Sequence, residues 1–365
     1  MVSVVLPTYN GQKYLCESID SILAQTMRNW ELIIVDDASN DNTGFIAEQY
    51  AKKDDRIHVI HNEHNQKLPE SLNIGFRQAK GEYLTWTSDD NLYEPQALEK
   101  MRNFLVKDEK CMMVVGNTIF FRGNEEERNR FDPKSMYLVN TVGGCFLYRK
   151  KVLEEIGGYD KEKFLVEDYD YWLRILSKYG QIGHIDVDLF RFRRHENSLT
   201  SKKVAEVRYR IDLLRREYLN NIFTQYASNK AILTEVFLSM VRNGLITDEI
   251  QERFSKYVAE LEGVTSFDEK KAFYIFGAGY RGRMISDAMG ENVIAFVDTD
   301  YNKIGRRING KIVLSVGNLK EKIEEKQIMI AIDDKRTYEI MSELWNHDIC
   351  RYCIMADYER KCMLR

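Results

Sequence analysis

The residues whose types and spacing carry the clearest chemistry are the adjacent carboxylates of Thr87-Ser88-Asp89-Asp90-Asn91. This stretch directly follows the apolar run Tyr83-Leu84-Thr85-Trp86, which is typical of a buried strand. Carboxylate oxygens, completed by water and substrate phosphates, are the ligands that hard divalent cations take at phosphate-transfer sites. Because a strand end holds its side chains still, the stretch predicts a site for a metal and a diphosphate.

Two earlier apolar runs also end in polar residues. The run 2–6 leads into Pro7-Thr8-Tyr9-Asn10, and the run 30–35 leads into Asp36-Asp37. Helical spacing between the runs predicts strands that alternate with helices, and hence a parallel sheet covered by helices. In such a sheet the ligand lies beyond the carboxyl ends of the strands. We therefore expect these two segments and residues 88–90 to meet at one edge, around one site.

Two later segments carry residues suited to the rest of such a site. Gly143-Gly144 enters a strand pattern, and a glycine pair lets a ligand approach the backbone, although a simple bulge would also explain it. The acids of Glu167-Asp168-Tyr169-Asp170 open a helix, where they complement the helix dipole. Three acids in four residues exceed that need. Asp168 is therefore also a candidate general base for an acceptor hydroxyl, with Glu167 and Asp170 as competitors.

The segment 189–200 is the main basic and aromatic cluster of the chain. An edge strand with solvated arginines is the simpler interpretation. We favour the alternative in which His195 and one or more of Arg191, Arg193 and Arg194 face the diphosphate, because that site needs cationic partners. His195 then joins Asp89 and Asp90 as a candidate metal ligand. The charged segment from Glu125 to Arg130 is predicted to be a surface loop.

The strand and helix pattern restarts towards the end of the chain. A strand over 272–276, a glycine loop over 277–282, a helix over 284–289 and a strand over 293–298 fit the dinucleotide-binding fingerprint. Gly277, Gly279, Gly282 and Asp298 are the candidate contacts of NAD or another nucleotide. The alternative is an empty packing or dimerisation module. Residues 202–262 predict two or three amphipathic helices, and 263–271 a linker.

Length and composition restrict the class of protein. A chain of 365 residues favours more than one domain, and a net charge of −4 gives no electrostatic footprint for nucleic acid. No apolar run approaches the roughly 20 residues that span a bilayer, and the chain opens on a strand pattern, so we expect a cytoplasmic protein. The six cysteines are expected to be free thiols. Cys350 and Cys353, with His347 and Cys362 nearby, lack the second pair of a zinc site, and a strand explains their spacing.

Four motifs, in order along the chain, resemble family 2 glycosyltransferases of the GT-A fold, including their spore-coat polysaccharide synthesis branch. They are Val4-Val5-Leu6-Pro7-Thr8-Tyr9-Asn10, Ile34-Val35-Asp36-Asp37-Ala38-Ser39-Asn40-Asp41, Thr87-Ser88-Asp89-Asp90-Asn91 and Glu167-Asp168. The resemblance implies a mixed, mostly parallel α/β sheet over residues 1–201. It also implies a helical connector over 202–268, and a Rossmann-like domain over 269–365 similar to modules that accompany some sugar O-acyltransferases.

The same resemblance implies roles for the site residues. The nucleotide, usually a uracil nucleotide, is expected at Pro7, Thr8, Tyr9, Asp36, Asp37, Ser88 and Asp89. Asp89 and Asp90 would flank the diphosphate and Mn²⁺ or Mg²⁺, and Asp168 would be the base of an inverting transfer. The resemblance also implies that Gly143 and Gly144 lie near the acceptor. From the residues themselves we add Glu167, Arg193 and Arg194 as candidate contacts of the acceptor and diphosphate. One departure stands out, because many relatives have Asp-x-Asp-Asp in the metal motif where this chain has Thr87.

The sequence thus predicts a metal-dependent inverting glycosyltransferase. It would move a sugar from a nucleoside diphosphate, expected to be UDP, to a hydroxyl of a glycan or lipid-linked acceptor in surface polysaccharide or capsule biosynthesis. Two rivals remain: an NAD-dependent enzyme that modifies nucleotide sugars with the C-terminal domain, and a non-catalytic nucleotide-sugar binding protein, which the Thr87 departure motivates. The sequence leaves open a homodimer and peripheral association with the inner face of a membrane.

Overall fold

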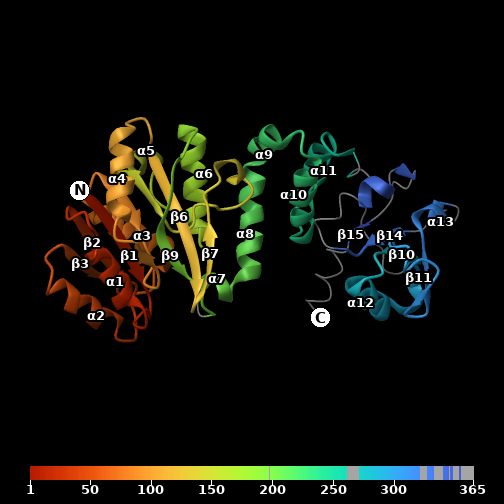
Figure 1. Cartoon of the computed structure of the whole chain (residues 1–365), viewed down its shortest axis with the longest axis horizontal. Coiled ribbons are helices and arrows are strands. Elements are labelled where there is room, and N and C mark those ends of the chain that lie inside the picture. Colours follow the sequence, from red (N-terminus) through yellow and green to blue (C-terminus); the bar gives the residue numbers. More distant parts are fainter. Residues whose placement is uncertain are drawn as a thin grey trace. The chain divides into compact units, whose positions relative to one another are not determined.

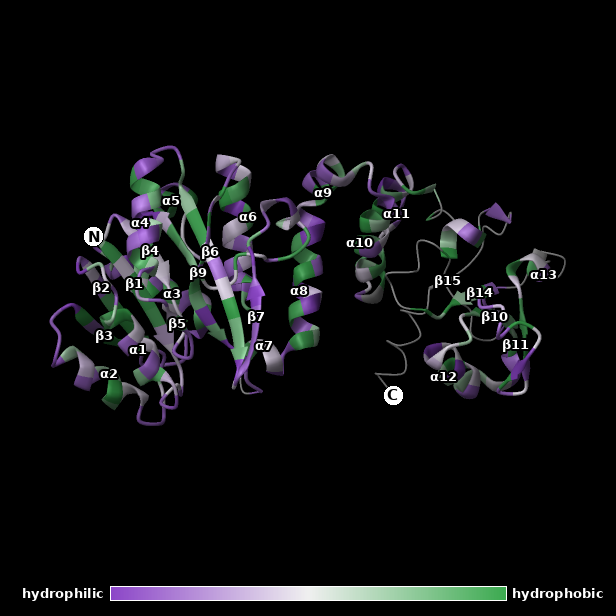
Figure 2. Cartoon of the chain, viewed as in Figure 1, coloured by the Kyte–Doolittle hydropathy of each residue, from purple (hydrophilic) through white to green (hydrophobic). Residues whose placement is uncertain are grey.

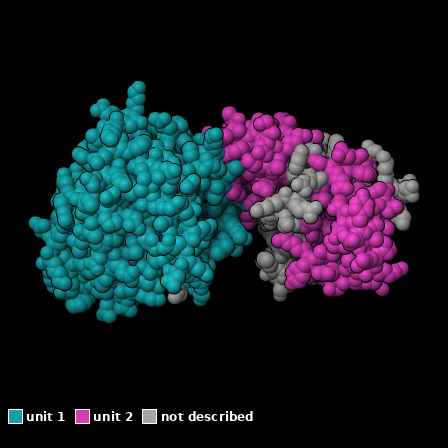
Figure 3. Space-filling view, in the orientation of Figure 1, with its two compact units in different colours: residues 1–214 teal, residues 215–365 magenta. Residues whose placement is uncertain are grey.

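The computed structural model describes residues 1–196, 198–259, 261, 271–320, 327–332, 340–344, 346–347 and 353–354. The chain divides into two compact units, Met1–Leu214 and Arg215–Arg365 (Figures 1 and 3). The division into three parts at residues 201 and 268 stays a prediction. Residues 263–270 of the predicted linker lie outside the described residues, as do Cys350 and Cys362 of the cysteine cluster.

The first half of the first unit is a parallel sheet covered by helices. Its elements are β1 (Val2–Thr8), α1 (Leu15–Leu23), β2 (Trp30–Asp36), α2 (Thr43–Ala51), β3 (Ile57–His61), α3 (Lys67–Gln78) and β4 (Tyr83–Trp86). β1 lies between β2 and β4, and β2 also pairs with β3, all in parallel. Every residue of β1 and β2 is buried, as expected of strands covered on both faces. The predicted alternation of strands and helices is confirmed.

The second half of this unit makes the sheet mixed. Its elements are β5 (Leu92–Tyr93), α4 (Ala97–Lys107), β6 (Met113–Arg122), β7 (Glu125–Asn129), β8 (Phe146–Arg149), α5 (Lys150–Ile156), α6 (Glu167–Tyr179), β9 (Gly183–Arg193) and α7 (Leu199–Lys202). Among the described residues, the strand order is β3-β2-β1-β4-β8-β6-β9-β5, with β7 paired to β6. β8 is antiparallel to both β4 and β6, whereas β9 is parallel to β6. Hydrophobic residues run along the central strands (Figure 2).

The prediction of a surface loop from Glu125 to Arg130 was wrong. Residues Glu125–Asn129 form β7, which pairs antiparallel with the end of β6. The two strands are joined by Gly123-Asn124, and Gly123 has a φ of 59°, which suits the tight turn of a hairpin. β7 is hydrophilic along its length (Figure 2), and an edge strand tolerates such charge.

The second unit contains helices followed by a smaller parallel sheet. α8 (Val204–Glu217) crosses the boundary between the units, and α9 (Leu219–Tyr226), α10 (Lys230–Arg242) and α11 (Asp248–Ser255) follow it. The sheet elements are β10 (Phe273–Phe276), α12 (Tyr280–Met289), β11 (Val293–Val297), β12 (Arg307–Ile308), β13 (Lys311–Leu314), α13 (Val316–Lys320), β14 (Gln327–Ile330) and β15 (Cys353–Ile354). Over the described residues the order is β12-β13-β11-β10-β14-β15, and only β12 and β13 pair antiparallel. None of the described helices has the length and apolar character needed to cross a bilayer.

Candidate active site

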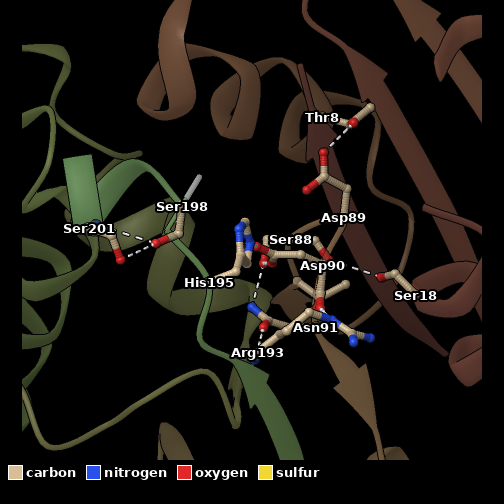
Figure 4. A network of polar contacts seen from close by, with 11 residues as sticks. Thr8, Ser18, Ser88, Asp89, Asp90, Asn91, Arg193, His195, Ser198 and Ser201 are labelled. Atoms are coloured by element: carbon tan, nitrogen blue, oxygen red, sulfur yellow. Dashed lines mark hydrogen bonds and ion pairs between the residues drawn. The ribbon is translucent and has the colours of Figure 1, made fainter. Parts of the chain in front are cut away.

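Three strand ends meet at one edge of the first sheet, as the sequence predicts. Thr8 ends β1 and lies beside Asp36, the last residue of β2. The backbone N–H of Asp37 donates to the carbonyl of Thr8 at 2.9 Å. The Thr8 hydroxyl donates to Asp89 Oδ2 at 2.5 Å, which ties the end of β1 to the residues after β4 (Figure 4). Thr8, Asp37 and Asp89 therefore belong to one connected cluster.

Asp37 is held with one carboxylate oxygen engaged. Its Oδ1 accepts hydrogen bonds from Asn62 Nδ2 at 2.8 Å and from the Gln66 backbone N–H at 2.7 Å. Its Oδ2 accepts no hydrogen bond from the described residues. The buried Asp37 can therefore present a fixed acceptor to a base N–H or a ribose hydroxyl.

Asp36, the other acid of the pair, has both oxygens engaged. Oδ1 accepts from the Ser39 N–H at 3.1 Å, and Oδ2 lies 3.0 Å from His61 Nδ1. Burial acts to lower the pKa of His61, but its hydrogen bonds with Glu48 and Asp36 outweigh that effect and raise the pKa. Asp36 thus fixes the loop after β2. Of the other residues predicted at the nucleotide, Pro7 is buried within β1 and Tyr9 is 49% exposed at the site edge.

Asp90 and His195 come together at the end of the site where the sequence predicts a metal. His195 Nε2 lies 2.9 Å from Asp90 Oδ2, and the Ser88 hydroxyl donates to Asp90 Oδ1 at 2.6 Å. The carboxylate of Asp89 points away from this pair, towards Thr8 (Figure 4). Burial, which outweighs the Thr8 hydrogen bond, raises the pKa of Asp89 to about 6. Among the described residues no three His, Cys, Asp or Glu side chains are arranged as a ready metal-ligand set.

The donors that are present fit a divalent ion in part. Asp90 and His195 can supply a carboxylate oxygen and an imidazole nitrogen, and a diphosphate and water would have to supply the rest. Thr87 does not take part, because its side chain is buried and its hydroxyl donates to the Ser88 carbonyl at 3.4 Å.

The structure separates the arginines that the sequence places at the diphosphate. Arg193 lies beside the candidate metal ligands: its Nε donates to the Asp90 carbonyl at 3.0 Å, and its terminal nitrogen donates to Glu17 at 2.7 Å. Arg194 instead donates to Glu127 at 2.6 Å, and Arg191 pairs with another glutamate of β7. Among the described side chains of these three arginines, only that of Arg193 donates a hydrogen bond to Asp90, whereas Arg191 meets this segment through the backbone pairing of β9 with β5.

The three acids at the start of α6 have different surroundings. Asp168 accepts hydrogen bonds from the Tyr169 N–H at 2.6 Å and from Asn140 Nδ2 at 3.0 Å. Burial, opposed by these bonds, raises the pKa of Asp168. Asp170 is buried in an ion pair with Arg174 at 2.8 Å, so it has a structural partner.

Glu167 is buried with an unsatisfied oxygen. Its Oε2 has no hydrogen-bond partner among the residues that the structure describes. Burial, followed by the charge of Asp168, raises the pKa of Glu167. Asp168 is thus the acid of this segment that combines hydrogen-bonded positioning with a raised pKa and no ion pair among the described residues.

The glycine pair after Asn140 is explained by packing. Gly143 has a φ of 66°, and a Cβ there would lie 2.6 Å from the Thr118 hydroxyl. A Cβ on Gly144 would lie 2.3 Å from the ring of Phe190. The two glycines let their loop pack closely on β6 and β9. The same loop contains Asn140, which donates its hydrogen bond to Asp168.

Sequence reasoning missed three residues of this site. A Cβ on Gly11 would lie 1.9 Å from Asp89 Oδ2 and 2.5 Å from the Thr8 hydroxyl. Gly11 therefore packs directly against the Thr8–Asp89 hydrogen bond and leaves no room for a side chain. Its place in the turn after β1 was an available signal. Asn140 and Gln66 gave no local signal, because their roles depend on contacts with residues 28 and 29 positions away.

In the second unit, the glycine loop has the spacing of the dinucleotide-binding fingerprint. The carboxylate of its acid, Asp298, is however occupied by donors of the same unit. Asp298 accepts from the Ala278 N–H at 2.9 Å, from the Asp300 N–H at 2.9 Å and from Lys303 Nζ at 3.1 Å. Gly277 has a φ of 104°, which suits a tight turn. The prediction of NAD at this loop has no support beyond the spacing of its glycines and acid.

The fold and the polar edge define a class, the GT-A transferases that act on nucleotide-diphospho-sugars. The family model described as glycosyl transferase family 2 matches residues 3–157. A Bacillus subtilis relative described as a putative teichuronic acid biosynthesis glycosyltransferase, TuaG, is 30% identical over 241 residues, which cover 63% of this chain and 95% of the relative. The chain therefore belongs to glycosyltransferase family 2, and it is a glycosyltransferase.

Further similarities agree with this assignment. The putative glycosyltransferase EpsE of Bacillus subtilis is 33% identical over 220 residues, 58% of this chain and 78% of EpsE. An uncharacterized glycosyltransferase of Rickettsia felis is 31% identical over 238 residues, 61% of this chain, and the matched part spans only 38% of that longer protein. The structure of S. aureus TarS 1–349 in complex with UDP-GlcNAc has a TM-score of 0.52 and 20% identity, and covers 71% of this chain and 80% of TarS 1–349. That similarity shows the fold alone.

Proposed function

We propose that this protein is a metal-dependent, inverting glycosyltransferase that moves a sugar from a UDP donor to a hydroxyl of a glycan or lipid-linked acceptor. The observation that carries the proposal is the convergence of Thr8, Asp37 and the Asp90–His195 pair on one strand edge. Thr8 and Asp37 would bind the nucleoside, and the Asp90–His195 pair would lie at the diphosphate. Asp168, with its raised pKa, adds a candidate base.

In the proposed reaction, the acceptor oxygen attacks the anomeric carbon of the sugar as Asp168 takes the hydroxyl proton. The bond between that carbon and the β-phosphate oxygen breaks, and its electron pair leaves with UDP. A base with a raised pKa accepts a proton more readily, provided that it is ionised at the working pH. Asn140 and the Tyr169 N–H would hold the carboxylate towards the acceptor. A divalent ion held by Asp90 and His195 would act as a Lewis acid that neutralises the departing diphosphate.

The biological setting is part of the same proposal. The relative TuaG carries a teichuronic acid description, which supports a role in surface polysaccharide assembly. Since sugar nucleotides are made inside the cell, we place the reaction at the inner face of the membrane. A homodimer stays a prediction.

A thermal-shift screen of the full chain tests the donor and the metal. UDP with Mn²⁺ should raise the melting temperature, because a ligand of the native state stabilises it by mass action, whereas UDP alone should raise it less. In Asp90→Ala the effect of Mn²⁺ should disappear, and in Asp298→Ala, which alters the second unit, it should remain. Absence of a shift with every nucleoside diphosphate would overturn the proposal.

A turnover assay separates this proposal from the non-catalytic alternative. With Mn²⁺ and a panel of UDP-sugars, the protein should release UDP, and an added acceptor should accelerate that release. A protein that binds UDP but shows no release with any donor and acceptor pair would instead support the binding protein that the Thr87 departure motivates.

A further inference from the structure

Lys67 occupies a backbone conformation that a lysine rarely adopts. It is the first residue of α3, directly after Gln66, and its φ is 65°, in the left-handed region. A residue with a Cβ pays a steric cost there, which the surrounding structure must offset. The backbone N–H of Lys67 donates to Asn65 Oδ1 at 3.1 Å, which helps to hold this conformation. A strained residue beside a site is a reason to ask what its side chain does.

The ammonium group of Lys67 has no anionic partner among the described residues. It lies 5.4 Å from the centre of the Phe164 ring, a cation–π arrangement, and the residue is exposed. The arginines of β9 differ in this respect, because Arg193 and Arg194 are each paired with a glutamate. Lys67 therefore carries a charge that an incoming anion could use without breaking an ion pair.

Lys67 also connects the two ends of the proposed donor site. The preceding residue, Gln66, donates its backbone N–H to Asp37, at the proposed nucleoside end. The ring that Lys67 covers, Phe164, is four residues before Asp168, at the proposed base end. A donor that spans the distance from Asp37 towards Asp168 would carry its diphosphate between these ends, and Lys67 has a neighbour at each of them.

We propose that Lys67 binds the diphosphate of the donor. This role rests on the proposed function, since it needs a nucleoside diphosphate in the site. The cation–π contact with Phe164 holds the ammonium group when the donor is absent, and the diphosphate draws it away from the ring. A lysine suits this task as a compact, flexible point charge.

The test compares UDP with uridine, which share the nucleoside but not the diphosphate. In calorimetric titrations with Mg²⁺, Lys67→Met should weaken UDP binding about tenfold and leave uridine binding unchanged, as loss of a charged hydrogen bond predicts. Lys67→Arg should keep most of the UDP affinity. Lys53→Met is a matched control: Lys53 is also exposed, covers the Tyr50 ring at 5.9 Å, and precedes β3 instead of following it. Its UDP affinity should equal that of the unchanged protein.

Lys67→Gly separates binding from structure, because glycine adopts the left-handed region without a steric cost. It should melt close to the temperature of the unchanged protein, yet lose UDP affinity as Lys67→Met does. UDP affinity equal to that of the unchanged protein would overturn the inference, as would an equal loss of UDP and uridine binding. If the unchanged protein itself binds no UDP, the proposed function fails and this role fails with it; every other outcome concerns Lys67 alone.

Discussion

The two units place an acid after a parallel strand in the same way, yet treat it differently. In the second unit Asp298 follows β11, and donors of its own loops, including the Lys303 ammonium, occupy its carboxylate. In the first unit Asp90 follows β4 and is paired only with a hydroxyl and an imidazole among the described residues. The neighbouring Asp89 has its pKa raised to about 6, chiefly by burial.

This difference teaches that an acid at a strand end is not in itself a functional signal. Both sheets place one there, because polar residues terminate buried strands. An acid that a lysine neutralises contributes to the stability of the fold, whereas one held without such a cation is a candidate for another role. Asp90 and Asp168 accept hydrogen bonds but pair with no lysine or arginine side chain of the described residues, as the proposed function requires, whereas Asp298 pairs with Lys303.

The largest effect is expected for Asp168→Asn. An amide cannot accept the acceptor proton, so kcat should fall about a thousandfold, within the usual range for loss of a general base. The free energy of unfolding should not decrease, because the change removes a charge that desolvation disfavours, as the raised pKa of Asp168 indicates. Rates of UDP release and urea denaturation measure the two quantities. Asp298→Asn should show the reverse, with normal rates and a less stable protein, and equal effects in both variants would break the comparison.

Gly11→Ala should come next. The added Cβ would lie 1.9 Å from Asp89 Oδ2, so the end of the site must shift, and a displacement of about 1 Å can cost about a hundredfold in rate. Steady-state kinetics with a UDP-sugar would show the loss in kcat/KM. Circular dichroism should show an unchanged fold, since Gly11 is in the turn after β1. Normal kinetics would mean that the Thr8–Asp89 cluster lies apart from the reacting groups.

Much of the first unit was predictable, because strands covered on both faces are continuous apolar runs. The runs that form β1, β2 and β4 are of this kind, and the polar residues after them were found for the same reason. β7 was missed because its residues are charged along their length, and only the Gly123-Asn124 turn signalled a hairpin.

The partners of the site residues were less predictable than the acids themselves. Asn140 reaches Asp168 from 28 positions away, and Arg193 reaches the Asp90 carbonyl from 103 positions away, so only the folded chain shows these contacts. The direction of Arg194 depends on Glu127, which lies on the strand that the sequence did not reveal.

Asn140→Ala should shift the pH profile of the reaction. The hydrogen bond from Asn140 favours the charged form of Asp168, so its loss should raise the pKa of Asp168 further. Because the base must be ionised, the acidic limb of kcat/KM should move about one unit to higher pH, the equivalent of one charged hydrogen bond. The rates should converge above that limb. A loss of equal size at every pH would mean that Asn140 affects the position of Asp168 but not its ionisation.

Glu167→Gln tests whether the ionised form of the buried Glu167 lowers the free energy of unfolding. Burial, with the charge of Asp168, raises the pKa of Glu167 to about 8, so the folded chain keeps this proton up to a higher pH than the unfolded chain does. The contribution of Glu167 to stability is therefore full below about pH 4 and is lost as the pH rises towards 8. The variant should gain about 1–2 kcal/mol over the unchanged protein at pH 8 and nothing near pH 4. Urea denaturation at both pH values measures this, and a variant that is less stable at pH 8 would contradict it.

The smallest effect is expected for Gly279→Ala. Gly279 has a φ of −84°, and a Cβ there would meet nothing within 4 Å, so neither strain nor a clash opposes alanine. Rates of UDP release should be unchanged, and the free energy of unfolding should change by less than about 0.5 kcal/mol. Gly282→Ala is the matched variant of the same loop, because its Cβ would lie 1.9 Å from the Gly277 carbonyl oxygen and should destabilise the second unit. If Gly279→Ala instead slows UDP release while the protein stays stable, the glycine loop of the second unit takes part in the reaction. The contrast between the strand ends of the two units then fails.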